Sequence, residues 1–106
     1  NCIVSNKNPS SSICDALLAS QPGKITFEIN QSTLKKGLDV SDQEVRKTIK
    51  ILAETLKLMV EPGGAVAAAA LLSKKIEVKN KNIVVMLSGG NIDRELFSQI
   101  VTKDYE

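Results

Sequence analysis

Residues 88–91, Ser-Gly-Gly-Asn, combine a hydroxyl group with unhindered backbone amides. The apolar residues before them, 83–87, are rich in β-branched side chains, which is typical of a strand buried on both faces. A helical pattern follows at about residues 93–101. This order places Ser88 at the carboxyl end of a strand, where open α/β sheets bind their ligands. The turn could bind an anion or a polar ring atom of a cofactor, or Ser88 could merely cap the helix.

A carboxylate precedes a second glycine pair at residues 61–64, Glu-Pro-Gly-Gly. Residues 65–72 are apolar on every side, which predicts a buried helix. Glu61 is a candidate functional carboxylate beside this helix. The alternative is a first-turn acid favoured by the helix dipole, with proline tolerated in the opening turn. Asp15 has the same two interpretations, as a site residue or as an acceptor for nearby backbone amides.

A third helix is predicted downstream of residues 41–44, Ser-Asp-Gln-Glu, which form a capping box. Val45, Ile49, Leu52 and Leu56 then recur at helical spacing. Residues 1–12 are expected to form a loop, and residues 10–12 can cap a short helix at 13–18. A turn is expected at 21–23, and strands are expected at 26–29 and 38–40. Residues 73–81 should form a charged connector.

Composition limits the possible partners of this 106-residue chain, which is long enough for one small domain. The net charge is +2, and no cluster of like charge exceeds a Lys-Lys pair. We therefore expect no nucleic-acid and no membrane partner. The absence of histidine excludes Ser-His and Cys-His catalysis within this chain. Two cysteines, Cys2 and Cys14, favour an inert role and a cytoplasmic location.

Residues 58–67 and 84–93, about twenty residues apart, closely resemble the last third of the catalytic domain of threonine dehydratase and serine racemase. These are fold-type II pyridoxal-phosphate enzymes. Residues 12–16, Ser-Ile-Cys-Asp-Ala, resemble the family's Ser-Ile-Ala-Asp-Gly stretch, with Cys14 and Ala16 as departures. Residues 40–44 resemble its strand-then-helix step. The resemblance covers nearly the whole chain after about residue 10.

The resemblance implies an α/β fold, a partial three-layer αβα fragment of a fold-type II (tryptophan-synthase-β-like) catalytic domain. Residues 1–106 would form a single segment, the C-terminal portion of that domain. Ser88 matches the serine that hydrogen-bonds the pyridine nitrogen of pyridoxal 5'-phosphate, and Glu61 matches the glutamate near the cofactor ring. Gly89 and Gly90 would let the ring approach, because glycine lacks a Cβ atom. No metal ligand is implied.

The family's Schiff-base lysine, in its Ser-Phe-Lys context, has no match here, and neither does its Gly-rich phosphate loop. No catalytic residue is therefore expected in this chain, and alone it should be inactive and prone to self-association. The parent is expected to be a homo-oligomeric dehydratase that converts L-threonine or L-serine to a 2-oxo acid and ammonia. Alternatives are a serine racemase, a hydroxyaspartate dehydratase, a non-catalytic module that binds a phosphorylated ligand, and a structural or regulatory domain.

Overall fold

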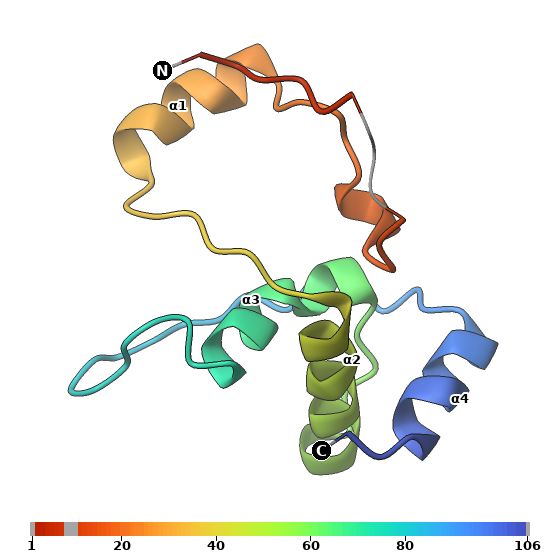
Figure 1. The fold of residues 1–106 in the computed structure, drawn as a ribbon. Helices are drawn as coiled ribbons and strands as arrows, with labels where there is room; N and C mark the ends of the chain where they lie inside the picture. Colours follow the sequence, from red (N-terminus) through yellow and green to blue (C-terminus); the bar gives the residue numbers. More distant parts are fainter. Residues whose placement is uncertain (1, 8–10, 106) are drawn as a thin grey trace.

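The computed structural model describes residues 2–7 and 11–105. The described parts of the expected loop 1–12 contain no helix, whereas residues 1 and 8–10, including Ser10 of the predicted cap, lie outside the described residues. Helices and the connections between them make up the fold (Figure 1). In chain order they are the 3-10 helix η1 (Asp15–Leu17), α1 (Lys24–Thr33), α2 (Asp42–Ile51), the π-helical turn η2 (Leu52–Leu56), α3 (Pro62–Leu72) and α4 (Arg94–Thr102).

Helix α2 begins at the predicted capping box. The Ser41 hydroxyl accepts a hydrogen bond from the Glu44 N–H at 3.3 Å, and the Glu44 carboxylate accepts one from the Ser41 N–H at 2.6 Å. Val45 and Ile49 are fully buried, as the apolar spacing predicts. Leu56 is exposed instead, because the helix widens into the π-helical turn and ends at Lys57, which has a left-handed backbone (φ 58°).

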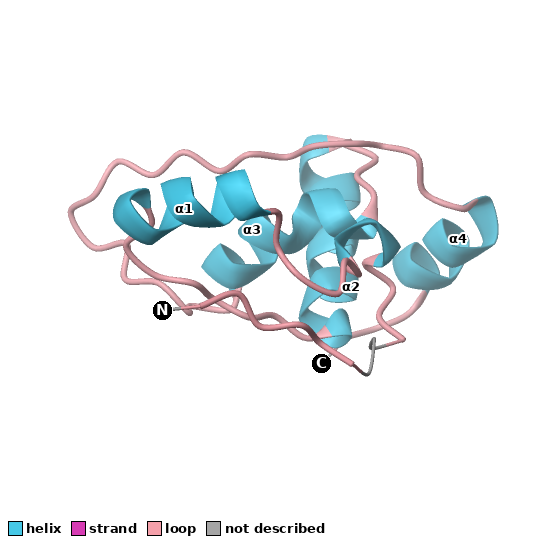
Figure 2. Ribbon diagram, turned by 90° about the horizontal axis from the view of Figure 1, so that it is seen from above, coloured by secondary structure: helices cyan, strands magenta, loops and turns pink. Residues whose placement is uncertain are grey.

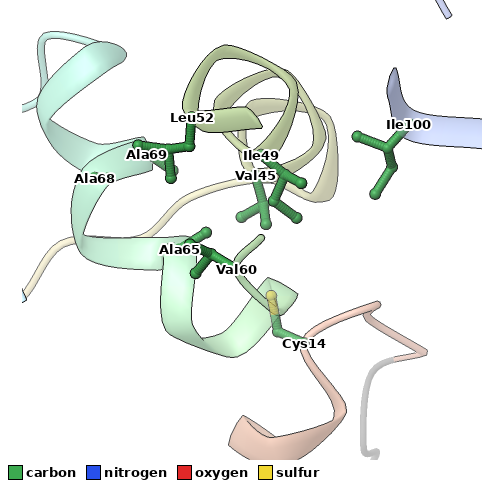
Figure 3. Close-up of a cluster of buried hydrophobic side chains, with 9 residues drawn as sticks. All are labelled: Cys14, Val45, Ile49, Leu52, Val60, Ala65, Ala68, Ala69 and Ile100. Carbon is green, nitrogen blue, oxygen red and sulfur yellow. The ribbon is translucent and has the colours of Figure 1, made fainter. Parts of the chain in front are cut away.

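Helix α3 packs on one side of α2, and α4 packs on another. Helix α3 starts at Pro62, three residues before the apolar run, because proline is well suited to the first helical position. Its alanines are small enough to let the two helices approach closely. The buried side chains between these helices form the core shown in Figure 3, namely Cys14, Val45, Ile49, Leu52, Val60, Ala65, Ala68, Ala69 and Ile100.

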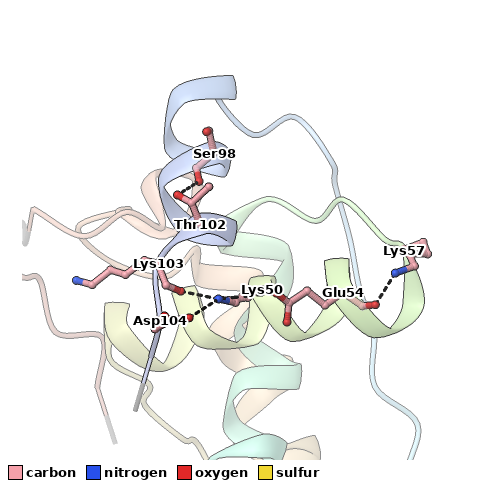
Figure 4. Close-up of polar contacts among 7 residues, drawn as sticks. All are labelled: Lys50, Glu54, Lys57, Ser98, Thr102, Lys103 and Asp104. Carbon is pink, nitrogen blue, oxygen red and sulfur yellow. Dashed lines mark hydrogen bonds and ion pairs between the residues drawn. The ribbon is translucent and has the colours of Figure 1, made fainter.

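The chain after α4 is fastened to α2 by Lys50. Its ammonium donates to the Lys103 carbonyl oxygen at 2.7 Å and to the Asp104 carboxylate at 3.3 Å (Figure 4). The same ammonium lies 3.8 Å from the carboxylate of Glu54, one helical turn along. Through these contacts, α2 holds residues 103 and 104, which lie near the end of the described chain.

The predicted strand at 26–29 is wrong, since these residues lie inside α1. Figure 2 shows helices and loops, and the described residues contain no strand. Ile25 and Ile29 are four residues apart, so the short apolar pattern suits a helix as well as a strand. Without a neighbouring strand, a helix satisfies the backbone hydrogen bonds within the segment itself. Helix α1 buries no residue and stands apart from the other helices (Figure 1).

The predicted strands at 38–40 and 83–87 are also not formed. Residues 83–87 have no hydrogen-bond partner in the described part of the chain. Val85 and Leu87 pack against the core, whereas Val84 and Met86 are 89% and 74% exposed. One face of this segment is therefore covered and the other is open, so burial on both faces is also wrong. Over residues 2–7 and 11–105, no helix has the length and apolar character needed to cross a membrane.

Candidate functional site

The two glycine motifs, far apart in sequence, lie against each other. The Glu61 N–H donates to the Gly89 carbonyl oxygen at 3.1 Å. The Glu61 carboxylate in turn accepts a hydrogen bond from the Asn91 N–H, also at 3.1 Å. Buried Val60 and Pro62 flank Glu61, so the glutamate is held at the junction of the core and α3. The structure thus brings Glu61, Gly89 and the adjacent Ser88 into one locality.

Close backbone approach explains two of the glycines. A Cβ atom on Gly64 would overlap the carbonyl oxygen of Ser88 and lie 2.6 Å from its carbonyl carbon. A Cβ atom on Gly89, which has a φ of +73°, would lie 2.6 Å from Oε2 of Glu61. Gly64 cannot accept a side chain without moving the Ser88 backbone away from α3. A side chain on Gly89 would be strained by the positive φ and would displace the Glu61 carboxylate. The glycines therefore allow residues 88 and 89 to contact α3 and Glu61 closely, which the sequence did not reveal.

Ser88 does not cap a helix. The cap of α4 is Asp93, whose carboxylate accepts the Leu96 N–H at 2.9 Å. Ser88 is exposed, and its hydroxyl has no hydrogen-bond partner among residues 2–7 and 11–105. The capping interpretation of Ser88 is therefore wrong, and the hydroxyl is available to a ligand.

A pocket of about 640 Å³ opens beside Glu61. Three segments line it, and Ser88 is outside the lining. The lining residues are Ile13, Asp15, Ala16, Glu61, Pro62, Asn91, Ile92, Asp93 and Leu96.

Asp15 and Asp93 bring carboxylates to this pocket in addition to Glu61. The Asp15 carboxylate accepts the Ala16 N–H at 2.8 Å, which confirms the expected local bond, but the residue also lines the pocket. Asp93 was not predicted as a site residue, although its position at a helix start after a glycine turn could have indicated it. In the described part of the chain, no group of His, Cys, Asp and Glu side chains is arranged to hold a metal ion.

Cys14 lies behind the pocket wall and is 7% exposed. Burial raises the pKa of its thiol. The Ser12 side chain lowers this pKa by less, and the carboxylates of Asp42 and then Asp15 add smaller increases. The thiol therefore stays protonated near neutral pH, which disfavours a nucleophilic role. This agrees with the expectation that Cys14 is an inert apolar residue.

Comparisons with known proteins identify the family. The family model described as "Pyridoxal-phosphate dependent enzyme" matches residues 3–89. The chain is 34% identical to the L-threonine ammonia-lyase of Thermotoga maritima, over 86% of this chain and 22% of the relative. It is 35% identical to the L-threo-3-hydroxyaspartate ammonia-lyase of Saccharomyces cerevisiae, over 90% and 29%. It is 34% identical to the serine racemase of Schizosaccharomyces pombe, over 86% and 28%. The chain thus spans less than a third of these relatives.

Solved structures give the same result. A threonine deaminase from T.th. superposes with a TM-score of 0.78 at 28% identity, covering 86% of this chain and 30% of that one. The serine racemase of Dictyostelium discoideum superposes with a TM-score of 0.74 at 28% identity, over 86% and 29%. These likenesses confirm the expected fold class, although the strand positions in this chain are unpaired over the described residues. The chain therefore belongs to the family of pyridoxal-phosphate dependent enzymes, as a partial fold-type II structure.

Proposed function

We propose that the complete protein is a pyridoxal-phosphate dependent ammonia-lyase, a dehydratase that converts L-threonine or L-serine to a 2-oxo acid and ammonia. The present chain would be the C-terminal portion of its catalytic domain. The contact between residues 61–64 and 88–91 carries this proposal, because it unites both family motifs in one locality. The threonine and hydroxyaspartate ammonia-lyases among its relatives support the reaction type.

The residues present fit one side of a pyridoxal-phosphate ring. The Ser88 hydroxyl is a neutral donor without a partner in the described part of the chain, which suits a ring nitrogen that accepts a hydrogen bond. Gly89 follows Ser88 directly, and the Glu61 carboxylate occupies the position that a Cβ atom on Gly89 would take. We therefore propose Ser88, Gly89 and Glu61 as cofactor-binding residues. When bound, the cofactor supplies the electron-withdrawing ring that stabilises negative charge at the substrate α-carbon.

The Ser88 hydroxyl would affect protonation of the cofactor ring nitrogen differently from a carboxylate at the same position. A carboxylate beside the ring nitrogen would stabilise a proton there, whereas a neutral hydroxyl leaves that nitrogen largely unprotonated. With the neutral Ser88 hydroxyl as donor, a bound ring would withdraw charge less strongly, and loss of the β-hydroxyl group would be favoured over transamination. In the complete enzyme, Ser88→Asp should lower the ratio of elimination to transamination. An unchanged ratio would contradict the role of Ser88.

The test of the proposed function is made on the full-length protein. We expect a visible Schiff-base absorbance that shifts when L-threonine is added, together with the release of a 2-oxo acid and ammonia. Ser88→Ala should weaken this response, whereas replacement of the exposed Ser32, which lies in the distant helix α1, should not. A protein without the absorbance would count directly against the pyridoxal-phosphate assignment.

Two further activities have support from the relatives. The hydroxyaspartate ammonia-lyase and the serine racemase are as similar to this chain as the threonine enzyme is. Incubation with L-serine separates them, since a racemase forms D-serine and a lyase forms pyruvate. We also propose a role in amino-acid metabolism, a small amino-acid substrate and a homo-oligomeric parent. A cytoplasmic location is proposed because Cys2 and Cys14 are both unpaired.

A further inference from the structure

Asp42 connects the start of α2 to a segment about thirty residues earlier in the chain. Its Oδ1 atom accepts a hydrogen bond from the Ser12 hydroxyl at 2.6 Å. Its Oδ2 atom accepts one from the Ile13 N–H at 3.1 Å. The Ser12 hydroxyl also accepts the Cys14 N–H at 3.1 Å, which extends the connection by one residue. Both carboxylate oxygens of Asp42 are therefore used on the segment that leads into η1.

That segment supplies one wall of the candidate site. Ile13, Asp15 and Ala16 line the pocket together with Glu61 and Pro62. The segment also rests on α3, since a Cβ atom on Gly63 would lie 3.4 Å from the Cβ atom of Ala16. Asp42 itself does not line the pocket. Residues 12–14 connect it to the lining.

These contacts can hold residues 12–14 firmly against the start of α2, an arrangement called the clamp below. Hydrogen bonds to an ionised carboxylate are roughly twice as strong as those between neutral groups. Asp42 also lies in the first turn of α2, where the helix dipole favours a negative charge. Neither oxygen is needed for the capping box, because Ser41 and Glu44 complete that motif by themselves.

We propose that Asp42 is a positioning residue of the candidate active site, which holds residues 12–16 in place as a wall of the Glu61 pocket. Its effect on catalysis rests on the proposed function. Its effect on the position of the wall does not, because the hydrogen bonds exist within this chain.

Cys14 provides a direct measurement of the wall. In the full-length protein, the rate of thiol labelling can be followed by mass spectrometry on the tryptic peptide 8–24, in which Cys14 is the only cysteine. Because the Asp42 carboxylate also raises the pKa of the Cys14 thiol, the rates are compared per thiolate, from their pH dependence. On that basis Asp42→Ala should raise the rate about tenfold or more, because loss of one charge-assisted hydrogen bond shifts an equilibrium by about that factor. Exposed Cys2 should react at the same rate in both proteins. An unchanged Cys14 rate would overturn the proposal.

Two control variants separate the clamp from general loss of stability. Asp39→Asn removes a nearby exposed carboxylate that makes no contact with residues 12–16, and it should leave Cys14 protected. Glu44→Gln weakens the start of α2 without touching the segment, and it should also leave Cys14 protected. Equal labelling of Cys14 in Glu44→Gln and Asp42→Ala would overturn the proposal in favour of helix fraying.

The partner side of the hydrogen bond offers a rescue test. Ser12→Ala removes the donor to Asp42 and should increase Cys14 labelling, whereas Ser12→Thr keeps the hydroxyl and should restore protection. Equal rates of Cys14 labelling in Ser12→Ala and Ser12→Thr would contradict the positioning role of Asp42.

Steady-state kinetics of the complete enzyme test the link to the site. Because the wall shapes the pocket, Asp42→Ala should raise KM about tenfold and change kcat much less, with cofactor absorbance retained. A fall in kcat at unchanged KM would overturn the positioning role. Faster Cys14 labelling in a protein that lacks lyase activity would support the clamp and reject the proposed function, so the two failures are distinguishable.

Discussion

Gly63 and Gly64 are adjacent glycines in the first turn of α3, and alanine should have opposite effects at the two positions. A Cβ atom on Gly63 would make an ordinary contact, 3.4 Å from the Cβ atom of Ala16. A Cβ atom on Gly64 would overlap the Ser88 carbonyl oxygen and lie 2.6 Å from the carbonyl carbon. We therefore predict that Gly63→Ala is tolerated and that Gly64→Ala disrupts the contact between the two motifs.

The geometry sets the size of each effect. Non-bonded carbon atoms rest about 3.5–4.0 Å apart, so relief of the contact with the carbonyl carbon alone moves Ser88 away from α3 by roughly 1 Å, and the closer carbonyl oxygen requires more. Such overpacking costs about 1–3 kcal/mol, and a misplacement of about 1 Å at a reacting centre costs roughly 100-fold in rate. Gly63→Ala requires no comparable movement and should gain about 0.5–1 kcal/mol from the better helix propensity of alanine.

The measurements are the free energy of unfolding and kcat/KM of the two variants of the complete enzyme, with cofactor absorbance as a third readout. We expect Gly64→Ala to lose stability, cofactor binding and activity together, whereas Gly63→Ala keeps all three. If Gly64→Ala were as stable and as active as Gly63→Ala, the close contact between α3 and Ser88 would be refuted.

Three further predictions concern the fold. The Ser41 N–H, and then Lys75, lower the pKa of Glu44 from 4.5 to about 2. Its stabilisation is therefore complete above pH 4.5 and lost as the pH falls to about 2, so Glu44→Gln should flatten the dependence of unfolding free energy on pH in that window. An undiminished slope would contradict this. Ile49→Ala should cost about 2–5 kcal/mol because Ile49 is fully buried, whereas Ile25→Ala should cost little because Ile25 is exposed. Equal costs would contradict the core assignment. Val84→Lys should reduce self-association of the isolated chain in gel filtration by charging the open face of residues 83–87; an unchanged elution profile would exclude that face.

Local signals predicted α2, α3 and α4, but not α1. The capping box at Ser41 and the apolar spacing through Ile49 specify α2 because both depend on residues three or four positions apart. The same holds for α4 and for the buried helix α3, whose composition is apolar throughout. Segments 26–29 and 83–87 could not be predicted in this way. A strand is stabilised by a partner from elsewhere in the fold, and the described residues provide none.

In the candidate site, too, some features could be predicted from the sequence and others only from the tertiary structure. The pattern of the sequence left the roles of Glu61 and Ser88 open. Its resemblance to the family predicted that Glu61, Ser88 and Gly89 belong to one cofactor site. Only the tertiary structure decided that Glu61 binds the Asn91 N–H, that Asp42 accepts hydrogen bonds from Ser12 and Ile13, and that Gly64 differs from Gly63. The physical reason is that helix signals act between neighbours along the chain. A close approach of two backbones, or a hydrogen bond across thirty residues, exists only after the helices have packed.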